Sequence, residues 1–361
     1  MVKYEEKYRD EALQLTGKRS FDGTFTVKHR SHSNIALVKY WGKRNYQIPQ
    51  NPSISFTLEN SVTDTVIKYR FKKERWLSFD FYFEGTANEY FAGRIRKYLS
   101  VLQTYFPFLE NLHLTISSTN SFPHSSGIAS SASAMSALAL CICSIEKKLF
   151  GTLRDEKKFL TKASFMARLG SGSAARSVFP GFVLWGESTA VKGSSDEIAI
   201  PLPVEINDTF SDIRDAILIT SAGKKKISSS AGHGLMQNHP FAQARYLQAN
   251  ENIITLMSAL TTGDKDMFTH IIENEALTLH SLMMSSNPGF TLLNERTWKI
   301  IDEIRNFREK TGKFVAFTLD AGPNVHLLYP GRDKTAIKEF IEQKVVGLCE
   351  NERWIDDGIK P

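Results

Sequence analysis

Cysteine is scarce in this sequence, with three residues in a chain of 361. Cys141 and Cys143 stand two positions apart and Cys349 is isolated, so the spacing indicates neither a disulfide framework nor a zinc site. No apolar run approaches the length of a membrane span, and the charged N-terminus lacks the apolar segment of a signal peptide. We therefore expect a protein of a reducing compartment, located in the cytoplasm and not bound to a membrane.

A strong charge of one sign is also lacking, since the formal net charge is +6 and charged residues make up 23%. The only basic run, at residues 224–226, is short, so the sequence does not indicate nucleic-acid binding. The Walker A, Gly-x-Gly-x-x-Gly and Gly-x-Ser-x-Gly patterns are missing too. What remains is an ordinary globular composition, 42% hydrophobic, long enough for two domains.

Alternating and helical patterns predict a mixture of strands and helices. After a polar leader, residues 24–38 begin with β-type residues. We expect strands at residues 51–58, 62–69, 77–83, 112–118, 181–186, 215–221, 314–319 and 325–329. The first three of these strands are expected to be antiparallel neighbours. Apolar spacing predicts helices near residues 89–106, 134–150, 157–169, 240–261, 264–284, 290–310 and 333–343. A polar stretch at residues 187–212 separates the two expected domains.

A hydroxyl-rich stretch at residues 122–133 leads into an apolar, Ala-rich segment that ends at Phe150. Gly127 permits a positive φ or a close backbone approach. The serines suit a helix start, where hydroxyls and unpaired backbone N–H groups converge and favour phosphate. Two interpretations stay open, a phosphate cradle or a serine-rich cap on a buried helix.

Two further segments carry cations suited to an anionic ligand. Lys39 and Lys43 flank Trp41 and Gly42. If this segment is a helix, the two lysines share a face, and if it is a loop, both could still reach one anion. The alternative is that both are ordinary surface lysines. Residues 170–177 form a Gly-Ser turn in which Arg176 could hold a carboxylate or phosphate bidentately. A simple break between helix and loop would use the same residues.

Asp320 ends an apolar strand and opens a tight turn, which makes both turn capping and catalysis possible. Phosphoryl transfer needs positioned phosphates, cations and a group that receives the acceptor's proton, and the segments above supply all three if they converge. The histidines have no metal-type spacing, and we interpret them as structural or exposed: His124, His233, His239 and His280.

Taken together, these motifs resemble the diphosphomevalonate decarboxylase family of the GHMP kinase superfamily, in the family's order, at residues 34–43, 122–133, 170–177 and 320–324. The resemblance implies an α+β GHMP kinase fold with a leader at 1–23. It implies an N-terminal α/β domain at 24–205, a C-terminal ferredoxin-like domain at 206–361, and a site in the cleft between them. It also implies ATP, Mg²⁺ and mevalonate 5-diphosphate, which is phosphorylated on its 3-hydroxyl and decarboxylated to isopentenyl diphosphate. Homodimers are common in the family.

The resemblance assigns roles residue by residue. Asp320 matches the acid/base that serves the 3-hydroxyl, Arg176 would hold the substrate carboxylate, and Lys39 would stabilise charge beside Asp320. Substrate would be bound by Tyr40, Trp41, Lys43, Ser171, Gly172, Ser173 and Arg176. ATP would be bound by Pro123, Ser125, Ser126, Gly127, Ala129, Ser130, Ser131 and Ala132, with the Ser131 hydroxyl near Mg²⁺.

The chain departs from the family pattern at residues 124–126 and at Ile128, Pro52 and Ala175. Residues 236–240 also lack an arginine that bacterial members often use on the substrate diphosphate. Three alternatives therefore stay open: a mevalonate 5-phosphate decarboxylase, a mevalonate 3-kinase, or a nucleotide-binding regulatory protein. The retention of a matching aspartate, arginine and lysine argues against the last.

Overall fold

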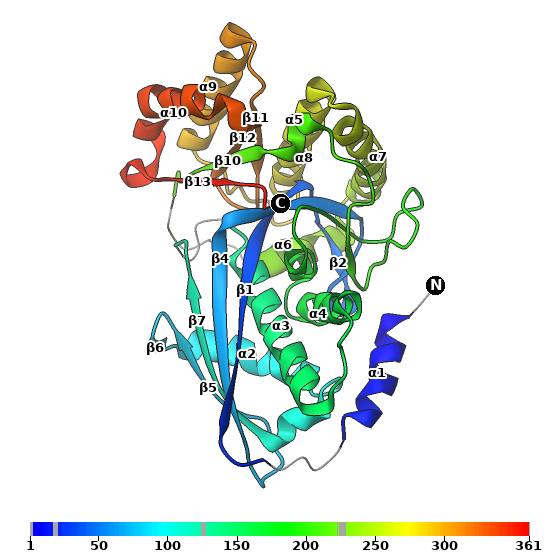
Figure 1. Cartoon of the computed structure of the whole chain (residues 1–361). Helices are drawn as coiled ribbons and strands as arrows, with labels where there is room; N and C mark the ends of the chain where they lie inside the picture. The colour runs from blue at the N-terminus through cyan, green and yellow to red at the C-terminus, as the bar shows by residue number, and fades with distance from the viewer. Residues whose placement is uncertain (1–2, 17–20, 124–127, 222, 224–228, 361) are drawn as a thin grey trace.

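The computed structural model describes residues 3–16, 21–123, 128–221, 223 and 229–360 of the chain. The two larger of the three sheets among these residues lie one in each half of the sequence, and helices pack against both (Figure 1). Within the described residues, no helix has the length and apolar character needed to cross a membrane.

Two long strands form the middle of the N-terminal sheet. β1 (Thr24–Val38) and β4 (Ser53–Phe71) pair antiparallel along most of their length, so the strands predicted at 51–58 and 62–69 are one continuous strand. The sheet runs β6-β5-β7-β4-β8-β9, with β1 also on β4. The other strands are β5 (Ser78–Phe83), β6 (Thr86–Ala87), β7 (Leu112–Asn120), β8 (Phe182–Trp185) and β9 (Ala199–Pro201).

The position of β5 corrects a prediction from the sequence. β5 lies parallel to β7 instead of antiparallel to β4. The reason is the helix α2 (Glu89–Leu102), which follows β5 and returns the chain to the same end of the sheet, as a parallel pair requires.

Three helices pack around the N-terminal sheet: α2, α3 (Ser130–Phe150) and α4 (Glu156–Gly170). α3 is buried on nearly every face, because its small residues let β1 and β4 approach closely. Cys141 and Cys143 belong to this buried surface and carry free thiols. Gly151 ends the helix in the left-handed conformation that a glycine adopts without strain.

The leader predicted at residues 1–23 contains an ordered helix, α1 (Tyr4–Gln14). Tyr8, Ala12 and Leu15 are buried against the N-terminal core, and the ring of Tyr8 meets the edge of Phe165 at 5.1 Å. The carboxylate of Glu197 accepts the first backbone N–H groups of the helix, at 2.6 and 3.3 Å. The charged composition hid this packing because only one narrow stripe of α1 is apolar.

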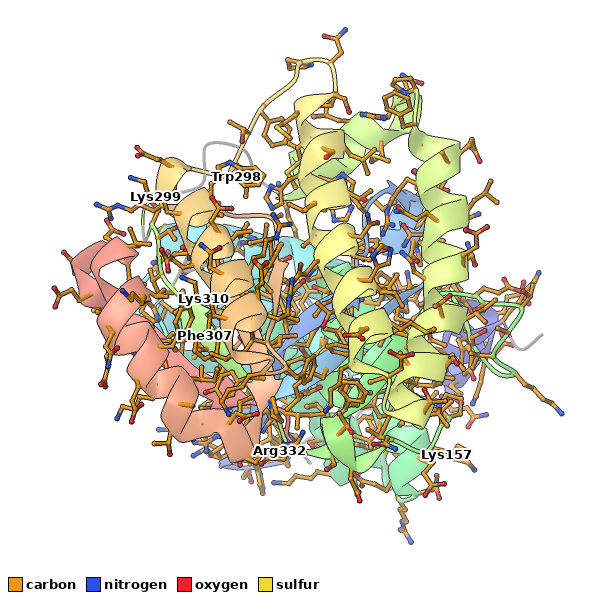
Figure 2. The ribbon with its side chains drawn as sticks, turned by 90° about the horizontal axis from the view of Figure 1, so that it is seen from above. Lys157, Trp298, Lys299, Phe307, Lys310 and Arg332 are labelled. Carbon is orange, nitrogen blue, oxygen red and sulfur yellow. The ribbon has the colours of Figure 1, made fainter. Side chains whose placement is uncertain are left out.

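The C-terminal sheet runs β11-β12-β10-β13 and is antiparallel throughout. Its strands are β10 (Ile213–Leu218), β11 (Ala316–Leu319), β12 (Val325–Pro330) and β13 (Trp354–Gly358). Alternate residues of β10 face opposite layers: Ile217 packs with α7 (Ala242–Thr262) and α8 (Lys265–Met284), and Leu218 with α9 (Glu295–Thr311) and α10 (Lys334–Phe340). Figure 2 shows these two helix pairs on opposite flanks.

Short elements complete the described chain. They are β2 (Lys43–Arg44), β3 (Ile48–Pro49), α5 (Asp208–Ser211), α6 (Ser229–Leu235), the 3₁₀ helices Asn45–Gln47, Pro107–Asn111, Gly172–Val178, Met236–Asn238, Gly331–Asp333, Val346–Leu348 and Glu350–Glu352, and the π-helix Ile341–Val345.

The two halves share one apolar cluster at their seam. Ile35 and Phe56 of the N-terminal sheet lie in the same buried cluster as Ile217 and Ile253 of the C-terminal half. The chain end strengthens the seam, because the Asp357 carboxylate accepts three successive backbone N–H groups of residues 59–61 at 2.8–2.9 Å. The seam therefore holds the segments of the site in fixed relation. The domain boundary near residue 205 stays a prediction.

We predict that Tyr8→Ala lowers the free energy of unfolding by about 3 kcal/mol, because it leaves a cavity where a large buried ring was. Leu13→Ala on the same helix is the control, since Leu13 is 73% exposed and its loss should change stability by less than about 0.5 kcal/mol. Urea denaturation followed by circular dichroism measures both. Equal effects would contradict the packing of α1.

Candidate active site

The segment after β1 carries the first cation of the site. β1 ends at Val38 and residues 39–42 form an irregular loop, with Gly42 at a φ of +98°, so the helical alternative for the two lysines is wrong. Lys39 is 2% exposed, and its Nζ donates to the Ala36 carbonyl. Lys43 is half-buried and donates to Gln47 Oε1 at 3.1 Å. Of the two lysines, Lys43 is the more accessible from solution.

Arg176 is held in place by hydroxyl and amide oxygens. Its Nε donates to Ser55 Oγ at 2.9 Å, Nη1 to Ser53 Oγ at 2.5 Å and Nη2 to Asn34 Oδ1 at 3.2 Å. The residue is 2% exposed, and burial lowers its pKa to about 10, against the opposing effect of Asp320. The turn at residues 170–177 is therefore more than a break between helix and loop, since it aims a buried guanidinium.

Asp320 follows β11 in a turn that is fixed through its backbone. Gly322 N–H donates to the Asp320 carbonyl at 2.7 Å, and His280 Nε2 on α8 donates to the same oxygen at 3.1 Å. Its neighbour Ala321 packs in one buried cluster with Trp41 of the Lys39 loop. The charge of Asp320 raises the pKa of both Lys39 and Arg176. Three segments far apart in the sequence thus converge, as phosphoryl transfer requires.

The charge state of Lys39 is finely balanced. Burial lowers its pKa to about 8, while the carboxylates of Asp320, Glu275 and Asp215 oppose the shift and Arg176 adds to it. Near neutral pH the ammonium form still dominates, and a modest change of its surroundings would shift the balance. Strongly perturbed groups of this kind gather at functional sites.

His233 lies inside the site, which the sequence did not indicate. Its ring sits 4.3 Å from that of Tyr40 and 4.6 Å from that of Trp41, and its Nδ1 accepts the Gly42 N–H at 3.0 Å. Burial, and then Lys43, lower the pKa of His233 to about 3, so the ring is neutral. The only signal in the sequence was its place between the two glycines of a polar, serine-rich segment.

The Tyr40 hydroxyl is buried and finds no hydrogen-bond partner within the described part of the chain. It lies beside Gly172, where an added Cβ would stand 3.0 Å from this oxygen and 2.6 Å from Trp185. Only glycine fits here. Because buried hydroxyls are normally paired, the oxygen marks a place where a ligand would supply the partner.

The phosphate-binding stretch continues into α3, which begins at Ser130. Ala129 at the helix start has a φ of 25°, and no described side chain caps the first turn. Ser131 Oγ lies 3.2 Å from Ser171 Oγ, which joins this helix start to the Gly-Ser turn. The first turn therefore keeps N–H groups available for an anion.

The remaining residues that were expected to bind ATP differ in how accessible they are. Pro123 is half-buried, whereas Ala132 is fully buried and its N–H donates to the Ala129 carbonyl at 2.7 Å, so it has little left to offer a ligand. Ser125, Ser126 and Gly127 lie outside the described residues, as do His124 and residues 224–226.

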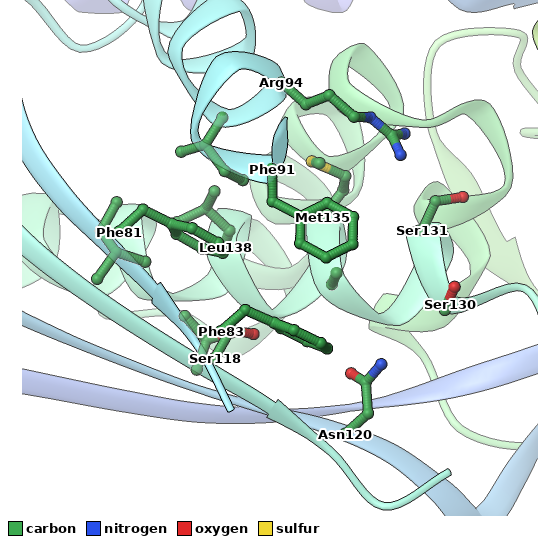
Figure 3. Close-up of a pocket in the computed structure, with 14 residues that line it drawn as sticks. Phe81, Phe83, Phe91, Arg94, Ser118, Asn120, Ser130, Ser131, Met135 and Leu138 are labelled. Atoms are coloured by element: carbon green, nitrogen blue, oxygen red, sulfur yellow. The ribbon is translucent and has the colours of Figure 1, made fainter. Parts of the chain in front are cut away.

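A pocket opens beside the start of α3 (Figure 3). Ser130 and Ser131 lie at one end of it and the apolar side chains at the other. Among the described residues, no group of three or more His, Cys, Asp or Glu side chains could hold a metal ion. The pocket is lined by Phe81, Phe83, Phe91, Ile95, Ile116, Met135 and Leu138, and by the polar side chains of Arg94, Ser118 and Asn120.

Comparisons with known proteins agree with this geometry. Residues 31–199 match a family model described as the diphosphomevalonate decarboxylase-like N-terminal domain, and residues 216–357 match the mevalonate 5-diphosphate decarboxylase C-terminal domain. The chain is 32% identical to the diphosphomevalonate decarboxylase of Ganoderma lucidum over 90% of this chain and 82% of that protein. This chain belongs to the diphosphomevalonate decarboxylase family.

Solved structures of diphosphomevalonate decarboxylases share the fold. The enzyme from Staphylococcus aureus matches with a TM-score of 0.78 and 30% identity, over 93% of this chain and 96% of that one. A protein named MDDEF, solved in complex with MVAPP, AMPPCP and magnesium, matches with a TM-score of 0.78 and 29% identity over 94% and 98% of the two chains. The α+β, two-domain GHMP kinase fold expected from the motifs is confirmed.

We predict that Gly232→Ala pushes α6 away from the site, because the new Cβ would lie 2.6 Å from the Trp41 ring. The hydrogen bond from Gly42 N–H to His233 should open. Because such a bond contributes about 1 kcal/mol, its loss should make the Gly42 amide exchange roughly fivefold faster. Hydrogen–deuterium exchange of peptides covering residues 40–43 measures this rate.

Gly234→Ala is the matched control for this variant, since a Cβ at Gly234 meets nothing within 4 Å. Unchanged exchange in the Gly232 variant would mean that α6 does not rest on Trp41.

Proposed function

We propose that this chain catalyses the ATP-dependent decarboxylation of mevalonate 5-diphosphate to isopentenyl diphosphate. The observation that carries the proposal is the convergence of the segments of Lys39, Arg176 and Asp320, in a chain of this family whose Gly-Ser turn is joined to the start of α3 through Ser171 and Ser131. A buried cation pair beside one carboxylate suits a reaction that transfers a phosphoryl group and then releases a carboxylate.

Asp320 is the group that takes the proton of the 3-hydroxyl. Its backbone is fixed by His280, so the carboxylate is presented from a rigid turn, and Lys39 steadies the charge that develops beside it. General base catalysis requires this combination of a carboxylate within reach and a fixed orientation.

Arg176 is the residue that holds the substrate carboxylate. A guanidinium has five N–H donors, and its contacts with Asn34, Ser53 and Ser55 use one hydrogen on each nitrogen. Within the described chain these contacts leave one N–H on each terminal nitrogen, which is the fork that a carboxylate accepts. Lysine could not reproduce it.

The chemistry follows from the substrate. A tertiary hydroxyl is a poor leaving group, and phosphorylation makes it a good one. As the carbon–oxygen bond breaks, positive charge builds at C3; the neighbouring carbon–carboxylate bond then breaks, CO₂ leaves, and its electron pair forms the double bond of the product. The products are ADP, phosphate, CO₂ and isopentenyl diphosphate.

The described residues fit ATP and magnesium. The aromatic side of the pocket suits an adenine ring, and the uncapped first turn of α3 suits phosphate. The donors there are hydroxyls such as Ser131, and magnesium commonly takes most of its ligands from substrate phosphates and water. A magnesium ion held in this way would neutralise charge on the transferred phosphoryl group.

Three groups could contact the 5-substituent. Lys43 is half-buried, and none of the ion pairs among the described residues involves it. Its charge acts on the neutral His233 ring, which lies 4.3 Å from the ring of Tyr40. Residues 236–240 supply no cation, and His239 is buried with Nε2 donating to the Leu282 carbonyl at 3.1 Å. We propose that Lys43 and Tyr40 bind the diphosphate. Homodimer formation and cytoplasmic location stay predictions.

A product assay with ATP and Mg²⁺ tests the function on mevalonate, mevalonate 5-phosphate and mevalonate 5-diphosphate, following ADP and CO₂ together. Equal release of both from the 5-diphosphate alone supports the proposal. Equal release from the 5-phosphate would identify the 5-phosphate decarboxylase, and ADP without CO₂ would identify a 3-kinase. ATP binding without turnover on any substrate would favour a regulatory protein.

We predict that Asp320→Asn lowers turnover by about 10²–10⁴-fold, because the amide cannot accept the proton, while ATP binding is retained. Isothermal titration calorimetry and ADP release measure the two effects separately. Asp302→Asn is the control, since Asp302 lies exposed on α9. Near-normal turnover in the Asp320 variant would remove the residue from the chemistry.

A further inference from the structure

A buried ion pair in the C-terminal half lies directly behind Lys39. Arg245 on α7 meets Glu275 on α8 through two parallel contacts, Nη1 to Oε1 at 2.7 Å and Nη2 to Oε2 at 2.6 Å. Arg245 is 2% exposed and Glu275 is fully buried. Asn252 also donates to Glu275 Oε1, at 2.6 Å. This is the bidentate geometry in which a guanidinium binds a carboxylate most strongly.

The Arg245–Glu275 pair forms hydrogen bonds with both the N–H and the carbonyl of Lys39. Lys39 N–H donates to Glu275 Oε2 at 2.8 Å, and Arg245 Nη2 donates to the Lys39 carbonyl at 3.0 Å. Asn51 Nδ2 donates to the same carbonyl at 2.9 Å. Because residues 39–42 lie beyond the end of β1, these contacts replace the strand ladder that would otherwise hold this peptide.

Stability alone does not account for such a pair. Burying two charges costs solvation energy, and apolar side chains of similar size often stabilise a core as well or better. The pair does what apolar side chains could not, since it offers a donor and an acceptor to one backbone residue at the seam between the two halves.

One helix therefore holds two reacting groups. α8 reaches Lys39 through Glu275, and it reaches the Asp320 turn through His280, whose Nε2 donates to the Asp320 carbonyl at 3.1 Å. The ammonium and the carboxylate come from opposite halves of the chain, and α8 sets their separation. A displacement of about 1 Å at such a site can lower a rate by about 100-fold.

We propose that Arg245 and Glu275 are positioning residues for the reaction, which fix the Lys39 backbone so that its ammonium stands beside Asp320. The proposal rests on the role given to Lys39 in the proposed function. Neither residue touches the substrate; they act through Lys39.

The charge of Glu275 provides a signature that a merely structural residue would lack. The groups that act on Lys39 are Asp320, Glu275 and Asp215, which raise its pKa, and Arg176, which lowers it; Arg245 stands behind Glu275. Removing the negative charge of Glu275 should lower the pKa of Lys39 further. The active, protonated form would then be lost at a lower pH, and the alkaline limb of the pH profile would shift to lower pH.

The test compares Glu275→Gln with Glu273→Gln on the same helix. Glu273 is also buried and ion-paired, with Arg308 at 2.6 Å, but it has no contact with Lys39 among those of the described chain. We expect kcat of the Glu275 variant to fall by about 100-fold with little change in the KM for ATP, and its alkaline limb to move to lower pH. The Glu273 variant should lose stability but keep the wild-type kcat and the wild-type position of the alkaline limb.

Two further measurements keep the proposal testable. If Glu275→Gln fails to fold, Arg245→Lys retains the charge but not the bidentate fork, and should lower kcat without moving the alkaline limb. If the wild-type chain shows no turnover, the proposed function fails, and NMR titration of the Lys39 ε-methylene still compares its pKa between wild type and Glu275→Gln. Equal kcat losses and equal Lys39 titrations in the Glu275 and Glu273 variants would overturn the positioning role.

Discussion

The burial of positive charge at the seam between the two halves is the constraint on which the site depends. Lys39 and Arg176 are each 2% exposed, and charges so far from water must be compensated by partners. Asn34, Ser53 and Ser55 supply oxygens to the arginine, and Asp320 supplies charge to both cations. Desolvation strengthens each of these interactions, and a site arranged before the substrate arrives needs little reorganisation during the reaction.

The seam also explains why the C-terminal helices matter to an N-terminal loop. Residues 39–42 belong to no strand in the described chain, and they are held by α6, α7 and α8 together with Asn51. His233 on α6 packs against the rings of Tyr40 and Trp41. Arg245 on α7 and Glu275 on α8 form hydrogen bonds with the Lys39 backbone. The neutral ring of His233 accepts a hydrogen bond without adding charge near Lys43. The packing of His233 and the placement of Lys39 thus belong to one interface between the two halves.

Much of the site could be predicted because its motifs are local. Short sequence patterns mark three of its parts: the Gly-Ser turn with Arg176, the hydroxyl-rich helix start and the aspartate after β11. The errors concerned contacts between segments that are far apart in the sequence. β5 pairs with β7 because α2 carries the chain across, and α1 packs through Tyr8 although its composition is mostly charged. His233 and Glu275 could not be recognised because neither belongs to a sequence motif and their partners are distant in the sequence.

The sequence by itself determined the apolar periods of the strands and helices, the turn chemistry around Asp320, and the kinds of side chain available for phosphoryl transfer. These are properties of neighbouring residues, so neighbouring residues reveal them. Tertiary structure alone decided which of those side chains are charged and where they stand. Lys39 and Glu275 are separated by 236 positions, yet their contact fixes the loop and shifts the pKa of the lysine. Burial and Coulomb interactions depend on distance in space, which a linear pattern does not record.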